Sequence, residues 1–268
     1  MIIIGEKING AIPSVAQAIA ERNEALIIER TLAQAKAGAH FLDCAPSTAT
    51  EIEYDTMVWL IDLMQGCADV PLCIDSPDAK LLARIIEEGR LNRPGMVNSV
   101  NEEGDKCETI FPLIAGTDWS VVGLTCDRDG IPTDTARKVD IAKRIIDKAD
   151  KYGVALENLH IDPCVMALAT QPAAMADFAA CIRQIHAYAP AVKVTGAISN
   201  CSFGMPARKY VNMSCLAYAM EAGLDSAILD PTSADMMGTL HACDALRMTD
   251  KGGRKYNRAY RKGLFGKK

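Results

Sequence analysis

Short apolar runs alternate with longer amphipathic segments along almost the whole chain, and this alternation limits the possible folds more than any other feature of the sequence. Eight runs have the length and composition of strands. They span residues 2–5, 39–43, 72–75, 96–98, 120–124, 159–162, 192–198 and 227–230. Alternating strands and helices are typical of a parallel sheet covered by helices, so an α/β protein is predicted. Eight repeats are the number that closes a (β/α)8 barrel of the TIM type.

Helical periodicity fills the intervals between these runs. The predicted helices span residues 26–37, 52–65, 79–88, 105–115, 135–151, 173–187, 211–222 and 235–246, and the fourth contains Pro112. A doubly wound open sheet is the alternative, but it normally carries G-x-G-x-x-G after its first strand, and residues 5–10 do not match that pattern. No linker-like stretch divides the chain. We therefore expect one domain over residues 1–250, followed by a basic tail over residues 251–268.

The composition excludes several classes of protein. Hydrophobic residues make up 49% of the chain, which is too many for a disordered protein. No stretch free of Asp, Glu, Lys and Arg exceeds 14 residues, whereas a membrane-spanning helix needs about 20, so no membrane association is expected. The first residues lack the basic region and the cleavage site of a secretory signal. The ten cysteines include no C-x-x-C pair, so we expect reduced thiols in a cytoplasmic protein without a metal site.

Charge is distributed unevenly along the chain. The formal net charge is −5, but residues 251–268 hold eight basic side chains and no acidic ones, so the remaining residues carry 21 basic and 34 acidic side chains. An acidic body lacks the basic face that nucleic acids require, and no nucleic-acid partner is expected. The tail is interpreted either as a solvated terminal segment or as a docking segment for an acidic partner.

Acidic and amide side chains stand at the ends of the predicted strands, where barrels of this type build their active sites. Seven of the eight ends carry one, and the residues are Glu6, Asp43, Asp75, Asn98, Asp162, Asn200 and Asp230. Strand-end lysines and Gly-rich turns are lacking, which argues against Schiff-base chemistry and phosphate binding. Carboxylates accept paired hydrogen bonds from an edge rich in N–H donors, such as that of a pterin ring. Two alternatives stay open, a divalent metal site on the same carboxylates and capping of the following helices.

Five short motifs, in order along the chain, carry a resemblance to a known family. They are residues 3–10 (IIGEKING), 73–76 (CIDS), 97–99 (VNS), 161–163 (IDP) and 199–206 (SNCSFGMP), the last followed by Arg208. The chain thereby resembles the pterin-binding methyltransferases of corrinoid-dependent methyl transfer. These include the methyltetrahydrofolate–corrinoid protein methyltransferases and the folate module of cobalamin-dependent methionine synthase.

The resemblance implies a (β/α)8 barrel, usually a homodimer, that binds tetrahydrofolate or 5-methyltetrahydrofolate as substrate. It implies pterin contacts at Asp75, Asn98 and Asp162. It also implies that Asn200 reaches N5, the atom that carries the methyl group, and that Arg208 lies near the p-aminobenzoate or glutamate part of folate. The further candidates for the same pocket are Glu6, Asp43 and Ser199. One departure is Ala45, because some relatives carry Asn two residues after the Asp of the second strand.

The implied corrinoid has to come from a partner protein. Carriers of base-off cobalamin display D-x-H-x-x-G, and none of the four histidines here has Asp two residues before it. Methyl transfer to or from N5 therefore predicts a corrinoid carrier protein as partner. The sequence leaves the direction of transfer open, but a compact barrel resembles the folate-charging component of an anaerobic demethylation system. Two other functions are alternatives, a folate-binding barrel without catalysis and a dihydropteroate synthase. The second is disfavoured, because residues 198–202 lack the Arg and Lys that such synthases place after strand seven.

Overall fold

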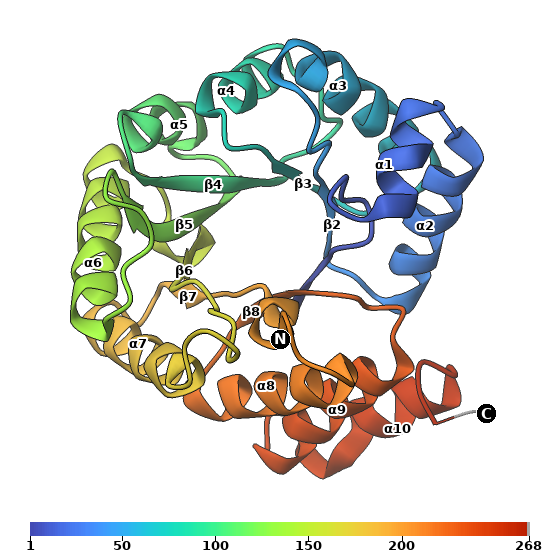
Figure 1. Cartoon of the computed structure of the whole chain (residues 1–268), viewed down its shortest axis with the longest axis vertical. Helices are drawn as coiled ribbons and strands as arrows, with labels where there is room; N and C mark the ends of the chain where they lie inside the picture. Colours follow the sequence, from blue (N-terminus) through green and yellow to red (C-terminus); the bar gives the residue numbers. More distant parts are fainter. Residues whose placement is uncertain (267–268) are drawn as a thin grey trace.

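The computed structural model describes residues 1–266, and its eight strands form one parallel sheet in the order β7-β6-β5-β4-β3-β2-β1-β8. The sheet curves round a central axis with the helices outside it (Figure 1). The strands are β1 (Ile2–Gly5), β2 (Phe41–Cys44), β3 (Leu72–Asp75), β4 (Met96–Glu102), β5 (Ser120–Asp127), β6 (Leu159–Asp162), β7 (Lys193–Val194) and β8 (Ser226–Leu229). The predicted (β/α)8 barrel is confirmed, and the open doubly wound sheet is excluded.

The barrel closes between β7 and β8 without a regular ladder. The backbone N–H of Asp225 donates to the carbonyl of Val194 at 3.1 Å, and that of Ile228 donates to the carbonyl of Gly196 at 3.0 Å. The prediction of a strand over residues 192–198 was wrong in its extent, because the regular strand ends at Val194. Single contacts with β6 and β8 continue as far as Ala197, and the chain then forms the 3-10 turn η2 (Ile198–Ser202). Asn200 therefore stands on this turn and not at a strand end.

The helices agree with the predicted segments, with two additions. They are α1 (Pro13–Ala20), α2 (Glu24–Ala37), α3 (Thr50–Cys67), α4 (Ala79–Glu87), α5 (Lys106–Ile114), α6 (Thr135–Tyr152), α7 (Ala174–Tyr188), α8 (Arg208–Ala222), α9 (Ala234–Leu246) and α10 (Arg254–Arg261), with 3-10 turns η1 (Leu156–Asn158) and η3 (Lys251–Gly253). The additions are α1 and α10, each of eight residues. No helix within residues 1–266 is long and apolar enough to span a membrane.

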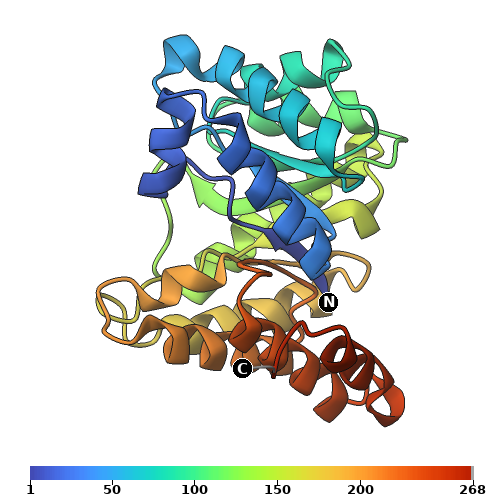
Figure 2. The same ribbon diagram turned by 90° about the vertical axis from the view of Figure 1, so that its right-hand side faces the viewer.

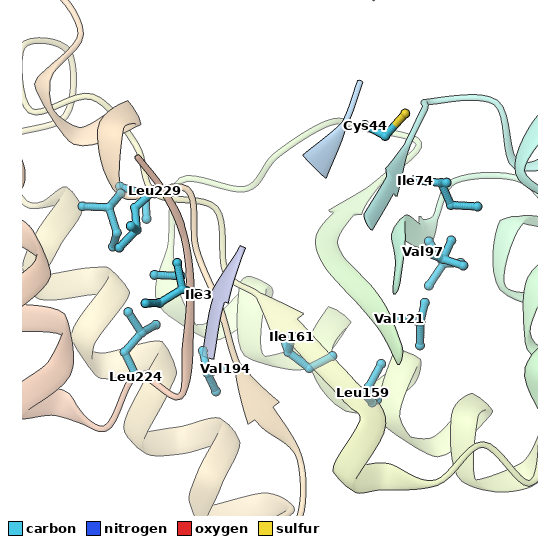
Figure 3. Packing of buried hydrophobic residues seen from close by; sticks show 14 of the residues in the cluster. Ile3, Cys44, Ile74, Val97, Val121, Leu159, Ile161, Val194, Leu224 and Leu229 are labelled. Atoms are coloured by element: carbon cyan, nitrogen blue, oxygen red, sulfur yellow. The ribbon is translucent and has the colours of Figure 1, made fainter. Parts of the chain in front are cut away.

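Successive side chains along each strand face opposite sides of the sheet, and this divides the core into two parts. Residues such as Ile74, Val97 and Val121 face outward and pack against the helices (Figure 3). A smaller cluster fills the barrel interior, and it consists of Ile4, Cys73, Met96, Val122 and Ile228. Side chains two positions apart on a strand point to the same face. The interior residues therefore predict which strand-end residues point into the barrel mouth.

The basic tail lies at the end of the barrel where the strands begin. Its helix α10 packs on α9, and the ring of Phe265 lies between them, with its centroid 5.8 Å from that of His241 on α9 and 4.9 Å from that of Tyr256 on α10. A cavity of about 320 Å³ there is lined by Met1 and His40 as well as by Arg258 and other residues of the tail. In Figure 2, α10 and α1 lie at opposite ends of the barrel. The division into a domain over residues 1–250 and a tail stays a prediction.

Gly10 provides a test of the tight packing at the barrel mouth. A Cβ atom at Gly10 would lie 2.0 Å from the backbone carbonyl oxygen of Pro46, whereas a Cβ at Gly66, inside α3, meets nothing within 4 Å. Gly10→Ala should lower the free energy of unfolding by about 1–3 kcal/mol, because backbone has to move. Gly66→Ala should leave it unchanged or raise it by up to about 1 kcal/mol. Urea denaturation measures both, and equal effects would contradict the packing described for Gly10.

Candidate active site

A cavity of about 780 Å³ opens at the end of the barrel where the strands finish. All eight candidate residues line it, and they are Glu6, Asp43, Asp75, Asn98, Asp162, Ser199, Asn200 and Arg208. Register explains this convergence for the strand-end residues. Glu6, Asp75 and Asn98 each stand two positions after a member of the interior cluster, so their side chains also face the inside of the barrel.

Two neighbouring carboxyl groups form an acceptor-rich wall of the cavity. Asp43 is 1% exposed, and its Oδ1 atom has no hydrogen-bond partner among residues 1–266. Burial and the adjacent Asp75 raise the pKa of the Asp43 carboxyl well above its ordinary value. Burial and Glu53 raise the pKa of Asp75 to about 7. A buried oxygen without a partner is unfavourable, so this wall favours a ligand that brings hydrogen-bond donors.

Asp162, at the end of β6, is buried and held by the backbone that follows it. The N–H of Cys164 donates to Asp162 Oδ1 at 2.7 Å. Burial raises the pKa of the Asp162 carboxyl to about 6, while this hydrogen bond and the positive charge of Lys138 act in the opposite direction. Asp162 is therefore mostly ionised at pH 7 although it is 6% exposed, and it presents an anion to the cavity.

Glu6 connects the first strand to the turn η2. The hydroxyl of Ser199 donates to Glu6 Oε2 at 3.3 Å. Burial, and to a smaller degree the charge of Asp230, raise the pKa of Glu6 to about 7, against the effect of the Ser199 hydrogen bond. Asp230 itself pairs with Lys7, whose Nζ atom lies 3.2 Å from its Oδ2 atom. Glu6 is thus a group that gains or loses a proton near neutral pH.

Arg208 supports the turn that carries Asn200. Its Nε donates to Ser202 Oγ at 2.8 Å, its Nη2 donates to the carbonyl of Ser199 at 2.9 Å, and its guanidinium stacks on the ring of Phe203 at 4.7 Å. These contacts leave Asn200 at the cavity wall on a braced turn. Arg208 is exposed at the rim, so it also has access to a ligand that extends out of the mouth.

Asp230, predicted from its strand end, also lines the cavity, and several other lining residues were not among the sequence candidates. They are Asn9, Ala11, Ile12, Pro13, Leu124, Ala197, Phe203, Lys209, Asn212, Met213, Ile228, Leu229, Ser233, Asp235 and Met236. Leu124 had a detectable signal, because it stands two positions after the interior residue Val122. Asn212 and Met236 lie on helices, and nothing in the sequence marks which turn of a helix borders the mouth.

The carboxyl and amide oxygens of this cavity suit an uncharged or cationic ring edge better than a metal ion. Within residues 1–266, no three His, Cys, Asp or Glu side chains are grouped so that they could hold a metal. The buried carboxylates instead face a cavity large enough for a multi-ring organic molecule. Their free acceptor atoms match a planar edge with several N–H donors.

Comparison with known proteins agrees with this geometry. The family model described as pterin binding enzyme matches residues 9–230. A methylcorrinoid:tetrahydrofolate methyltransferase from Eubacterium limosum is 45% identical over 268 residues, which covers 99% of this chain and 98% of that protein. Methionine synthase from Mycobacterium tuberculosis is 30% identical over 242 residues, covering 85% of this chain but only 20% of that protein.

Solved structures show the same fold at low sequence identity. Dihydropteroate synthase from Xanthomonas albilineans in complex with 7,8-dihydropteroate superimposes with a TM-score of 0.65 at 18% identity, covering 92% of each chain. Dihydropteroate synthase from Yersinia pestis gives a TM-score of 0.66 at 16% identity, covering 93% of this chain and 94% of that one. At these identities the likeness concerns the fold alone.

The raised pKa of Glu6 predicts a pH-dependent effect on stability. The folded state keeps the Glu6 proton up to about pH 7, whereas the unfolded chain loses it near the ordinary value, so the stability of the ligand-free protein falls as pH rises through this window. Glu6→Gln should be about as stable as the parent at pH 4.5 and more stable by about 1–2 kcal/mol at pH 8, a discounted value because the side chain is partly exposed.

Urea denaturation at a series of pH values measures this difference, with Glu29→Gln, on the exposed face of α2, as the matched control. The control should show no pH-dependent difference from the parent. A Glu6→Gln profile parallel to that of the parent between pH 4.5 and 8 would contradict the raised pKa.

Proposed function

The chain belongs to the family of pterin-binding enzymes, and on that premise we propose that it transfers a methyl group from a corrinoid, carried by a partner protein, to N5 of tetrahydrofolate. The observation that carries the proposal is the set of buried carboxylates at the mouth, with an unpartnered acceptor atom on Asp43. The 45% identity over nearly full length to a methylcorrinoid:tetrahydrofolate methyltransferase supports the same reaction.

Recognition of the pterin ring is assigned to the carboxylate wall. Asp162, ionised at neutral pH, accepts a pair of hydrogen bonds from the ring N–H and the exocyclic amino group, since a carboxylate can receive two parallel donors. Asp75 and Asn98 bind the same ring from the adjacent strands β3 and β4. Asp43, deeper in the barrel, accepts a further hydrogen bond. Arg208, at the rim, is placed for the anionic glutamate part of folate.

Asn200 is assigned to N5, with Ser199 and Glu6 beside it. Transfer to N5 forms an N–C bond, breaks the cobalt–carbon bond of the partner's methylcorrinoid with its electron pair left on cobalt, and releases the N5 proton. A polar group therefore has to follow the change of charge at N5. A carboxamide can donate or accept a hydrogen bond without titrating. Ser199 links this position to Glu6, and the raised pKa of Glu6 allows it to exchange a proton at neutral pH. The protein supplies position and dipoles, and it supplies no nucleophile.

The corrinoid carries the methyl group and reaches the mouth of the barrel on its carrier protein. The rim next to Asn200 offers the exposed Phe203 and Arg208 to this partner. The basic helix α10 lies at the other end of the barrel, so its position favours a structural role and not carrier docking. A homodimer and a cytoplasmic location are further proposals, the first testable by analytical ultracentrifugation.

Methyl transfer is tested by mixing the protein with tetrahydrofolate and free methylcobalamin under anaerobic conditions and following the cobalamin absorption spectrum. The proposal expects demethylation that depends on both the protein and tetrahydrofolate. Tight binding of tetrahydrofolate without spectral change would instead support a folate-binding barrel without catalysis. Formation of dihydropteroate from a pterin diphosphate and p-aminobenzoate would support the synthase alternative.

Asn200→Ala separates binding from chemistry. If Asn200 acts on N5 only as its charge changes, kcat should fall about a hundredfold, equivalent to about 3 kcal/mol, whereas the affinity for tetrahydrofolate should fall only several-fold. Asn200→Asp should be slower still in the direction of transfer in which N5 stays neutral, because a carboxylate cannot donate a hydrogen bond.

Single-turnover stopped-flow spectroscopy measures the transfer step. Asn257→Ala, on the exposed face of α10 at the other end of the barrel, is the matched control and should react like the parent. A rate for Asn200→Ala within threefold of the parent would assign N5 to another group.

A further inference from the structure

Lys138, on the inner face of α6, is a buried cation without a role in the cavity lining. Its side chain is 1% exposed, among the largest fully buried side chains of the protein. A buried ammonium group is unfavourable unless hydrogen bonds and a counter-charge compensate for the lost water. The Nζ atom donates to the carbonyl oxygen of Cys164 at 3.0 Å. Lys138 therefore contacts the residue that holds Asp162.

Cys164 connects the two charges through its backbone. Its carbonyl accepts from Lys138, while its N–H donates to Asp162 Oδ1 at 2.7 Å. Its φ angle is +59°, in the left-handed region that an L-residue other than glycine, Asn or Asp seldom adopts. An unfavourable conformation persists only where surrounding contacts fix it. Lys138 and Asp162 fix it from its two sides.

Asp162 is the carboxylate that can compensate the charge of Lys138. The thiols of Cys164 and of Cys181 on α7 lie near the ammonium, and burial raises the pKa of both, so they are neutral. Asp134 and Asp177 lie at the edge of this cluster. Asp134 caps α6 by accepting from a backbone N–H, and Asp177 accepts from Thr135 and Gln171, so both are engaged elsewhere.

Within its own strand, Asp162 has no charged neighbour that could replace Lys138. His160 stands two positions earlier on the same side, and burial lowers its pKa to about 3, so it is neutral. Its Nδ1 atom is hydrogen-bonded to the hydroxyl of Ser226 at 2.8 Å. Burial opposes the ionised form of Asp162, whereas Lys138 and the Cys164 N–H favour it.

We propose that Lys138 is a positioning residue that, acting through Cys164, keeps Asp162 ionised and directed into the cavity. Its consequence for folate affinity rests on the proposed function, because Asp162 is there assigned to the pterin ring. Lys138 touches no substrate. Its effect on the ionisation of Asp162 exists in the ligand-free protein, which makes it measurable whether or not the protein binds folate.

The first arm of the test measures Asp162 directly. The ¹³C resonance of its carboxyl group, assigned by its loss in Asp162→Asn, is titrated in the ligand-free protein. In Lys138→Met, which keeps the length but removes the charge and the donor, the midpoint should rise by at least about one pH unit. Lys138→Arg should keep it near that of the parent. Lys143→Met, at an exposed position of α6, is the matched control and should change nothing.

The second arm measures tetrahydrofolate affinity by calorimetry. With a midpoint one to two pH units higher, the ionised fraction of Asp162 at pH 7 falls from about nine-tenths to between one half and one tenth. Lys138→Met should therefore bind about two- to tenfold more weakly at pH 7 and recover toward the parent at pH 8.5. In the Asp162→Asn background the same substitution should have no further effect, because the carboxylate on which Lys138 acts is then absent.

These arms separate the possible failures. An unchanged midpoint in Lys138→Met, or an equal loss of affinity with and without Asp162, would overturn the role assigned to Lys138. If no variant and no parent protein binds tetrahydrofolate, the proposed function fails, and the carboxyl titration still decides the role of Lys138. If Lys138→Met does not fold, Lys138→Gln, which keeps a donor without the charge, is measured by both arms with the same expected direction.

Discussion

Closure of the sheet between β7 and β8 is the constraint on which the site depends. The two strands share no regular ladder, and the gap is bridged by the carbonyls of Val194 and Gly196. The side chain of Asp225 strengthens the seam, because its Oδ2 atom accepts from the Val194 N–H at 2.8 Å and lies 3.1 Å from His186 Nε2. Since β7 ends early, the chain is free to form η2. The seam thus places Asn200 opposite the carboxylates of the other strands.

The buried acidic groups of this cavity are unfavourable in the ligand-free protein, and the same groups are the ones assigned to ligand binding. Burial raises the pKa of Glu6, Asp43, Asp75 and Asp162 together, and Asp43 Oδ1 has no hydrogen-bond partner within residues 1–266. A ligand with a row of N–H groups removes part of that penalty on binding. The four groups are not equivalent, because Asp162 has a buried cation behind it whereas Asp75 has the carboxylate of Glu53. Of these two groups, the surroundings therefore favour the ionised form at Asp162, at the end of β6.

Much of the fold and of the ring of candidate residues followed from the sequence, because both depend on where the short apolar runs begin and end. Glu6, Asp75 and Asn98 were identified as the residues at the ends of predicted strands, and they line the cavity. The turn η2 was not, since residues 192–198 have strand-like composition and only the seam with β8 decides where the strand stops. Lys138 was not found either. Arg137 and Lys138 are adjacent cations, and only the rotation of α6 buries one while the other pairs with Asp127 and Asp129 at the surface.

Both ends of the described chain lie at the face of the barrel opposite the cavity, where Met1 and Leu264 line the same small hollow. A barrel with this layout can be joined at either end to other domains without covering its mouth. In the methionine synthase of Mycobacterium tuberculosis, the matching region makes up 20% of the length. For the protein in the laboratory, the same layout means that an affinity tag or surface attachment at the N-terminus, beside Met1, leaves the mouth of the cavity open to solution.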